Sequence, residues 1–278
     1  MKNLKDKVAA LTGAGSGIGR SLAVLLAKEG CRLALSDINE AGLAETAKML
    51  GSTEVVTSVL DVADREKMQE WADATAREFG GVDLVINNAG VAVFDTIEDI
   101  SYEDFEWAFN IVFWGVVYGT KSFLPHLRKR PEGHIVNISS INGILPFPYN
   151  GPYNCAKFAV KALNETLNQE LHDSSIIVTS VHPGGVKTNV ARNMRYVKSY
   201  TEDVCQNDLA TMFDGICRTT ANQAALKIIK GIKKNKRRLL IGADARLMDL
   251  GARLMPLPAV KLTRNFHERM LTGLKNNK

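Results

Sequence analysis

Short apolar runs alternate along the chain with longer stretches in which apolar residues recur at helical spacing. Seven runs have the length and composition of strands: Val8–Leu11, Arg32–Ser36, Glu54–Leu60, Asp83–Asn87, His134–Ile138, Ile176–His182 and Leu239–Ile241. Strands that alternate with helices form parallel sheets. Several of the runs lack polar alternation, as expected for strands covered on both faces. The pattern therefore predicts a doubly wound α/β fold with a seven-stranded parallel sheet.

Charge and cysteine content exclude several classes of protein. The 278 residues carry 35 lysines and arginines against 30 aspartates and glutamates, an excess too small to indicate nucleic-acid binding. The basic run from Lys233 to Arg238 is interpreted as the charged end of a helix. The four cysteines lack metal-binding spacing, so no metal site is predicted and reduced thiols in the cytoplasm are expected. No apolar run has the length of a membrane span or an export signal.

A glycine-rich turn follows the first predicted strand. It reads Thr12-Gly13-Ala14-Gly15-Ser16-Gly17-Ile18-Gly19 and leads into a helical stretch from Ser21 to Lys28. Glycines allow the backbone to turn sharply and to approach a pyrophosphate, whose charge then meets free N–H groups at the positive end of the helix. The turn therefore predicts a Rossmann-like dinucleotide site.

An acidic residue, Asp37, ends the second predicted strand about twenty residues after the glycine turn. A carboxylate there can accept hydrogen bonds from ribose hydroxyls and would repel a 2′-phosphate, which favours NAD over NADP. The alternative is that Asp37 only caps the helix that starts near Asn39. Arg20 complicates the choice because a basic side chain near the turn could compensate a phosphate.

Tyr153 and Lys157 stand four residues apart in the helical segment Gly151–Leu171, so their side chains project from one face. An ammonium about 4 Å from the phenol is worth on the order of 4 kcal/mol at an effective dielectric of 20, which would lower the phenol pKa by roughly three. The phenol could then exchange a proton with a carbonyl or an alcohol. Ser140 follows a predicted strand at the edge where parallel sheets bind ligands, and it could polarise a substrate oxygen; Ser139 is a competing candidate.

Together these features resemble the short-chain dehydrogenase/reductase family from Lys5 to about Gly242. The matching motifs are the cofactor loop Thr12–Gly19, Asp61 with Val62, the Asn-Asn-Ala-Gly motif Asn87–Gly90, Asn110, Ser140, Tyr153 with Lys157, and Pro183-Gly184-Gly185 with Val186 and Thr188. The resemblance implies a nicotinamide-dependent enzyme that interconverts alcohols and carbonyl compounds. It further implies a homodimer or homotetramer formed through the helices Glu103–Arg128 and Gly151–His172.

The resemblance also implies a role for each matched residue. Tyr153 would be the acid/base, Lys157 would lower its pKa and bind the nicotinamide ribose, and Ser140 would polarise the substrate. Asn110 would hold a water in a proton path through Lys157. Because Asn110 falls in the apolar helical pattern Phe105–Leu124, a buried amide is expected, with a satisfied core Asn as the alternative. The implied cofactor contacts are Gly13, Ser16, Gly17, Ile18, Gly19, Asp37, Asp61, Val62, Asn88, Ala89, Gly90, Tyr153, Lys157, Pro183, Gly184, Val186 and Thr188.

Residues 1–242 are expected to form a dinucleotide-binding catalytic domain whose polar segment, about 187–220, serves as the substrate loop. Residues 243–278 extend the same domain as a helical tail, in which Leu247, Leu250 and Leu254 recur at helical spacing until Pro256 and Pro258 stop the pattern. We favour packing of this tail on the core or on a second subunit. A lid over the active site and a contact with a membrane surface are the alternatives.

The catalytic pattern does not name the substrate, because many substrates share this fold and these residues. A group of apolar side chains favours a hydrophobic alcohol or ketone, although some of them could be ordinary core: Phe94, Ile144, Leu145, Phe147, Met194, Tyr196, Met212 and Phe213. Two other functions stay open, an NADPH-dependent carbonyl reductase and a dinucleotide-binding regulator without turnover.

Overall fold

The computed structural model describes residues 1–190, 193–196, 211 and 215–276. Part of the predicted substrate loop, including Met212 and Phe213, therefore lies outside the described residues. In the part of the chain that the structure describes, no helix is long and apolar enough to cross a membrane.

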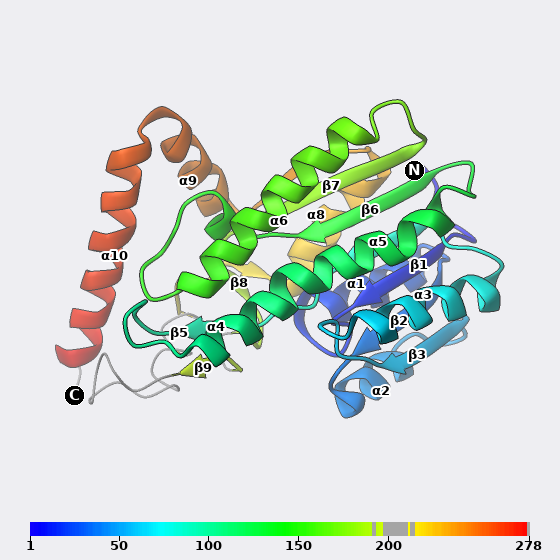
Figure 1. Cartoon of the computed structure of the whole chain (residues 1–278), viewed down its shortest axis with the longest axis horizontal. Coiled ribbons are helices and arrows are strands. Elements are labelled where there is room, and N and C mark those ends of the chain that lie inside the picture. Colours follow the sequence, from blue (N-terminus) through cyan, green and yellow to red (C-terminus); the bar gives the residue numbers. More distant parts are fainter. Residues whose placement is uncertain (191–192, 197–210, 212–214, 277–278) are drawn as a thin grey trace.

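A seven-stranded parallel sheet forms the centre of the protein, in the order β11-β7-β6-β4-β1-β2-β3 (Figure 1). All seven predicted strands are present, which confirms the predicted fold class. They are β1 (Val8–Thr12), β2 (Arg32–Asp37), β3 (Val55–Val59), β4 (Leu84–Asn87), β6 (Gly133–Ile138), β7 (Ile176–Pro183) and β11 (Arg238–Ile241). Every residue of β1, β4 and β6 is buried, which explains why these runs lack polar alternation.

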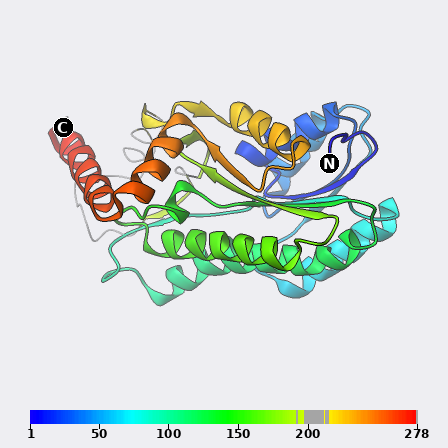
Figure 2. The same cartoon turned by 90° about the horizontal axis from the view of Figure 1, so that it is seen from above.

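Helices cover both faces of the sheet (Figure 2). On β1, Ala9 and Leu11 pack into a cluster with α1 and α8, whereas Val8 and Ala10 pack into a second cluster with α3, α5 and α6. The alternate side chains of a strand point to opposite faces, so one apolar run supplies two cores. The helices are α1 (Gly17–Lys28), α2 (Glu40–Lys48), α3 (Arg65–Phe79), α4 (Tyr102–Phe109), α5 (Gly115–Leu127), α6 (Gly151–Glu170) and α8 (Ala221–Lys233).

The predicted helix Phe105–Leu124 consists of three consecutive helical parts. A π-helical segment, η1 (Asn110–Trp114), joins α4 to α5. Single π turns inside α-helices occur often at functional sites. The turn begins at Asn110, the residue that the sequence singled out.

Short elements lie beyond the carboxyl ends of the strands. Two small parallel pairs form there, β5 (Val93–Phe94) with β9 (Arg195–Tyr196), and β8 (Val186–Lys187) with β10 (Thr219–Thr220). A 3₁₀ turn, η2 (Ile141–Gly143), follows β6. These elements build the rim around the candidate site.

Two helices form the end of the chain, α9 (Ala243–Leu254) and α10 (Pro256–Asn276). The expectation that Pro256 and Pro258 stop the helical pattern was therefore incomplete, because α10 begins at Pro256. Proline is tolerated in the first turn of a helix, where N–H groups have no intrahelical partner. The two helices meet at a corner and project from the sheet layers (Figures 1 and 2).

Candidate active site

Ser140, Tyr153 and Lys157 converge at the carboxyl end of β6. Ser140 caps η2, and its Oγ accepts a hydrogen bond from the Asn142 N–H at 3.1 Å. Tyr153 lies in the first turn of α6, and its phenol is hydrogen-bonded to the Ser140 side chain. Lys157 lies one turn further along α6 with its Nζ 5.4 Å from the centre of the Tyr153 ring. The structure thus brings Ser140, at the end of a strand, together with the Tyr153–Lys157 pair of the helix.

The pKa values of the Tyr153–Lys157 pair do not follow the sequence-based expectation. Burial raises the pKa of the Tyr153 phenol, and the hydrogen bond from Ser140 opposes this only in part. Burial also lowers the pKa of Lys157 to about 7, and its Nζ donates to the Ile138 carbonyl at 2.7 Å. The expected lowering of the Tyr153 pKa by Lys157 was therefore wrong for the protein alone, because burial destabilises both charged forms.

Contacts and exposure bear on two of the residue assignments at this site. The Ser139 hydroxyl donates to the Lys157 backbone carbonyl at 3.0 Å, so it fixes α6 against β6, whereas Ser140 faces Tyr153. The expectation that Asn110 is buried was wrong, because its side chain is exposed. The π turn displaces the register of the helix, so the apolar spacing that implied burial does not apply there.

The glycine turn forms a tight cradle at the start of α1. Gly17 has a φ of +55°, and a Cβ at Gly19 would lie only 1.9 Å from the Gly13 carbonyl oxygen. A Cβ at Gly13 would lie 2.8 Å from the Ala89 Cα, so the turn also approaches the segment after β4. Ser16, the N-cap of α1, makes no side-chain capping bond. The first N–H groups of α1 thus have no side-chain cap, as a phosphate site requires, and the cradle fits a dinucleotide.

Asp37 contacts the glycine turn directly. Its carboxylate accepts hydrogen bonds from the Gly15 N–H at 2.7 Å and from the Asn39 N–H at 2.9 Å. The cap of α2 is Asn39, whose side chain accepts from the Gly42 N–H, so the capping alternative for Asp37 was wrong.

Arg20 is held by groups of the protein itself. Its Nε donates to Thr46, and its Nη2 donates to the carbonyls of Gly15 and Gly42 and to the Glu45 carboxylate. Two of its donor nitrogens therefore already have acceptors.

The remaining candidate cofactor residues surround the same cradle. Asn88 donates from its side chain to the carbonyls of Thr12 and Gly13, both at 3.1 Å. A Cβ at Gly90 would lie 3.8 Å from the Lys157 Nζ, and one at Gly17 would lie 3.4 Å from the Thr188 side chain. The cradle therefore contacts both the segment after β4 and the segment after β7, and the segment after β4 reaches Lys157.

Other members of the predicted cofactor set differ in exposure. Val62 is buried against Gly115 at the start of α5, whereas Asp61 is exposed. Ile18 and Val186 are half-buried against the core. Gly184 follows β7, where its N–H donates to the Ile241 carbonyl at 2.9 Å. Pro183 is the last residue of β7.

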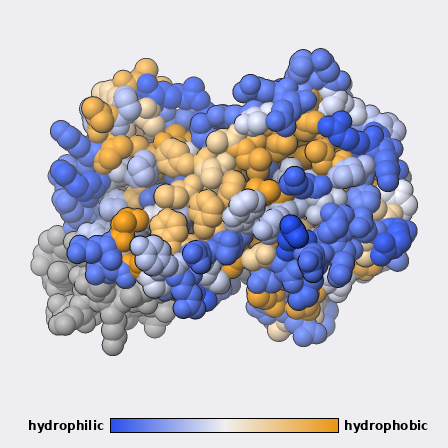
Figure 3. All heavy atoms as spheres, viewed as in Figure 1, coloured by the Kyte–Doolittle hydropathy of each residue, from blue (hydrophilic) through white to orange (hydrophobic). Residues whose placement is uncertain are grey.

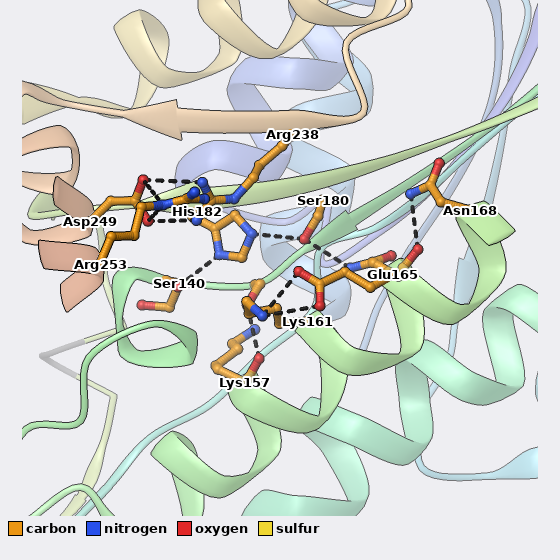
Figure 4. Close-up of polar contacts among 12 residues, drawn as sticks. Ser140, Lys157, Lys161, Glu165, Asn168, Ser180, His182, Arg238, Asp249 and Arg253 are labelled. Carbon is orange, nitrogen blue, oxygen red and sulfur yellow. Dashed lines mark hydrogen bonds and ion pairs between the residues drawn. The ribbon is translucent and has the colours of Figure 1, made fainter. Parts of the chain in front are cut away.

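A buried chain of polar side chains, which the sequence analysis missed, ends at Ser140. His182 Nδ1 lies 3.1 Å from the Ser140 carbonyl oxygen, and its Nε2 lies 2.9 Å from Ser180 Oγ (Figure 4). A carbonyl oxygen only accepts, so Nδ1 carries the proton and Nε2 accepts from the Ser180 hydroxyl. Asn164 donates to Ser180 Oγ at 3.1 Å and accepts from Asn137 at 2.8 Å.

The chain continues to β4, where Asn87 donates to the Asn137 side chain at 2.7 Å. Each member donates toward Ser140, so the bonds share one direction and reinforce one another. The available sequence signal was the polar residues inside otherwise apolar strands, Asn137 in β6 and Ser180 and His182 in β7. His182 therefore holds the backbone of Ser140 in place.

The inner face of α10 packs on the segment between Ser140 and Tyr153. Thr263 donates to the Pro146 carbonyl at 3.1 Å. The His267 ring stacks on Tyr149 at 4.8 Å and on Phe94 at 5.6 Å, between ring centres. His267 is buried, and burial lowers its pKa to about 4. The C-terminal helix thus forms one wall on the substrate side of the site.

The residues of the predicted apolar cleft differ in burial. Phe94, Leu145 and Met194 are buried, and Ile144 and Phe147 are half-buried. The side chain of Tyr196 lies outside the described residues, as do Met212 and Phe213.

Comparisons with known proteins agree on one family. The family described as short chain dehydrogenase matches residues 7–198. The oxidoreductase SadH of Mycobacterium tuberculosis is 43% identical over 261 residues, which are 92% of this chain and 93% of that protein. A crystal structure of a short chain dehydrogenase/reductase from Burkholderia phymatum in complex with NAD has a TM-score of 0.81 and 30% identity, covering 91% of this chain and 96% of that one. An alcohol dehydrogenase from the archaeon Thermococcus sibiricus, complexed with 5-hydroxy-NADP, has a TM-score of 0.71 and 27% identity, covering 85% of this chain and 96% of that one.

The buried His182 predicts a loss of stability in mild acid. Burial lowers the pKa of His182 to about 4, below the unfolded value of about 6.5, so protons bind the unfolded chain more strongly. Neutral His182 contributes its full stabilisation of the folded protein above pH 6.5, and this contribution is lost as the pH falls toward 4. At pH 5 the loss amounts to about 2 kcal/mol. Urea unfolding at pH 7 and pH 5 should show a fall in the free energy of unfolding that is larger than this, because burial also lowers the pKa of His134 to about 3 and that of His267 to about 4.

Two variants identify the source of that fall. His182→Gln should reduce it by about 2 kcal/mol, because the titrating imidazole is gone. His172→Gln changes an exposed histidine and should leave the fall as it is in the unchanged protein. Equal falls in the unchanged protein and in His182→Gln would contradict the assignment.

Proposed function

Because the chain belongs to the short-chain dehydrogenase family and is an NAD(P)-dependent oxidoreductase of alcohols and ketones, we propose that Ser140, Tyr153, Lys157 and Asn110 perform its chemistry. The observation that carries this proposal is the convergence of Ser140, Tyr153 and Lys157 beside the glycine cradle. A bound nicotinamide dinucleotide supplies or accepts the hydride. The dinucleotide would be held by the cradle Gly13–Gly19, by Asp37, and by the segments that begin at Asn88 and Pro183.

Tyr153 serves as the acid/base at the substrate oxygen. Since burial raises the pKa of the phenol, the protein holds Tyr153 in its neutral form, which can donate its O–H proton to a carbonyl oxygen. Ser140 donates a hydrogen bond to the same oxygen and so stabilises the charge that develops on it. His182 keeps Ser140 in position through the Ser140 carbonyl.

Lys157 returns a proton to Tyr153 and orients the ribose of the dinucleotide. With a pKa of about 7, its Nζ can hold or release a proton at neutral pH. Its bond to the Ile138 carbonyl fixes the direction of Nζ. The exposed Asn110 would hold the water from which this proton path starts. An exposed amide at a π turn is suited to that role, because bulk water reaches it.

Replacement of the Tyr153 hydroxyl tests these roles. Tyr153→Phe should bind NADH with nearly unchanged affinity, because the ring and its packing stay, while turnover falls by at least a thousandfold. Fluorescence titration measures the first quantity, and steady-state oxidation of a secondary alcohol panel measures the second. The Tyr102→Phe variant, which removes the hydroxyl of an exposed side chain, is the matched control, and it should keep most of its turnover. Retention of most turnover by Tyr153→Phe would refute the role.

We propose NAD rather than NADP as the preferred dinucleotide. The carboxylate of Asp37 lies against Gly15 at the place where a 2′-phosphate would meet its negative charge. Arg20 does not offset this charge, since its Nε and Nη2 already donate to protein acceptors. An NADPH-dependent carbonyl reductase is the second candidate. It would need a cation in place of Asp37 to bind the 2′-phosphate.

Parallel titrations of the two dinucleotides test the preference. NAD should bind at least tenfold more tightly than NADP to the unchanged protein. The Asp37→Ser variant should narrow this ratio to near unity, because it removes the repulsion and the ribose acceptor together. A tenfold preference of the unchanged protein for NADP would overturn the proposal.

We also propose that the substrate is an apolar alcohol or ketone and that the enzyme works in the cytoplasm. The described walls on the substrate side of the site carry Phe94, Leu145, Tyr149 and Met194. Such walls favour hydrophobic substrates through the area that they remove from water. Cys155 is an exposed free thiol, which is typical of a reducing compartment.

We also propose a homo-oligomer formed through α5 and α6. An apolar band crosses the face that these helices form (Figure 3). Rings of Phe113, Trp114 and Tyr118 follow one another with centres 5.4 and 5.6 Å apart, and Trp114 is 40% exposed. Phe158 on α6 is 39% exposed. Large exposed apolar patches with aromatic side chains are typical of subunit interfaces.

Light scattering after size exclusion measures the assembly. The unchanged protein should elute as a dimer or a tetramer. The double variant Trp114→Glu with Phe158→Glu should give a smaller species, because it buries charge at the interface. Met49→Glu, which alters an exposed side chain at the end of α2, is the control and should leave the mass unchanged. A monomeric unchanged protein would contradict the proposal.

A further inference from the structure

The corner between α9 and α10 carries five large exposed apolar side chains. We name it the C-terminal ridge, and it consists of Leu247 (72% exposed), Leu250 (53%), Leu254 (70%), Met255 (53%) and Leu257 (77%). The two helices that carry the ridge project from one end of the molecule (Figures 1 and 2). Isolated exposed leucines are ordinary, but five large exposed apolar side chains within eleven residues concentrate apolar area at one corner.

The ridge is not the face by which α9 packs on the protein. Ala245 and Asp249 form the inner face of α9, one turn apart, and Asp249 accepts two hydrogen bonds from Arg238 on β11 at 2.6 and 3.0 Å (Figure 4). Leu247, Leu250 and Leu254 recur at helical spacing on the opposite face. The Arg238–Asp249 pair thus fixes α9 with its leucines turned outward.

Helix α10 also packs on the protein through a face other than the one that carries the ridge. Ala259, Thr263 and His267 recur every four residues and are all buried. Thr263 and His267 contact the segment Pro146–Tyr149, as described above. The protein's own core therefore uses the inner faces of both helices and leaves the ridge without a packing partner in the described chain.

Charge accompanies the ridge. Residues 243–278 carry seven lysines and arginines against three aspartates and glutamates, a net charge of +4 out of the +5 of the whole chain. Two of the acids are turned inward, since Asp249 pairs with Arg238 and Asp244 accepts from the Gly185 N–H at 2.6 Å. Arg246 and Lys261 are exposed beside the ridge, whereas Arg264 pairs with the third acid, Glu268, at 3.6 Å. The outer surface at this corner is consequently both apolar and positive.

We propose that the C-terminal ridge docks the enzyme on an anionic membrane surface. Exposed leucines enter the boundary between headgroups and acyl chains, and neighbouring lysines and arginines bind the anionic headgroups. Each basic residue near such a surface adds to the attraction, so the apolar and the charged parts act together.

The positive charge beside the C-terminal ridge disfavours a second copy of the chain as the partner that covers the ridge. A two-fold contact through the ridge would use the same surface of both subunits, so it would bring together two positive patches that each contain Arg246 and Lys261. Like charges across an interface are destabilising. An anionic surface, in contrast, is complementary to all of them at once.

Docking at this corner would bring the substrate side of the site near the lipid. The inner face of α10 stacks on Phe94 and Tyr149, and its first turn carries the end of the ridge. A hydrophobic alcohol or ketone concentrates in membranes. This consequence rests on the proposed function, whereas docking itself does not.

Vesicle sedimentation of the full-length protein tests the docking. Protein should sediment with vesicles of phosphatidylcholine and phosphatidylglycerol but not with vesicles of phosphatidylcholine alone, and high salt should weaken binding because it screens the headgroups. The double variant Leu247→Ser with Leu254→Ser should lower the partition coefficient at least tenfold. Leu226→Ser on α8, which alters a side chain that is 50% exposed, is the matched control and should bind like the unchanged protein.

Turnover of a water-soluble alcohol, measured without vesicles, distinguishes the two proposals. The ridge variant should keep this activity and its oligomeric mass while losing vesicle binding. Failure of the unchanged protein to bind anionic vesicles, or equal binding by the ridge variant, would overturn the docking and leave the enzymatic proposal intact. A fall in oligomeric mass of the ridge variant, measured by light scattering, would also overturn the docking, because it would identify a second copy as the occupant.

Discussion

The site depends on the junction between the end of β6 and α6. Lys157 makes two contacts across it, one from its Nζ to the Ile138 carbonyl and one from the Ser139 hydroxyl to its own carbonyl, at 2.7 and 3.0 Å. The approach is so close that a Cβ at Gly143 would lie 2.5 Å from the Lys157 carbonyl oxygen. Since Ser140 extends β6 and Tyr153 belongs to α6, the distance between hydroxyl and phenol is set by this junction. A shift of α6 along the sheet would separate them.

The same junction explains why so many polar groups are buried around it. Asn137, Asn164 and His182 are almost fully buried and would each cost free energy without partners. They offset that cost through a chain of hydrogen bonds, each donated toward Ser140, where the chain ends. A network of this kind admits few alternative arrangements, so it specifies the position of Ser140 more narrowly than apolar packing would. The network requires a neutral His182, because its Nε2 must accept the hydrogen bond from Ser180.

The strands and the glycine turn could be predicted from the sequence because each depends on local information. Eight consecutive residues specify the cradle, and the buried runs specify the sheet. The exposure of Asn110 could not be predicted, since the π turn η1 alters the helical period on which the expectation relied. The prediction that Lys157 lowers the pKa of Tyr153 was wrong for another reason. The spacing of the two residues gives the distance between them but not the burial of both groups. The role of His182 depends on its pairing with a residue 42 positions away.

The C-terminal helices are tied to the cofactor side as firmly as to the substrate side. Asp244, in the first turn of α9, accepts from the Gly185 N–H, and a Cβ at Gly184 would lie 2.1 Å from its carboxylate. The segment after β7 can therefore keep its path only while α9 stays in place. From the other end, α10 supports the segment between Ser140 and Tyr153. A displacement of the outer corner of these helices would therefore act on both segments that flank the candidate site.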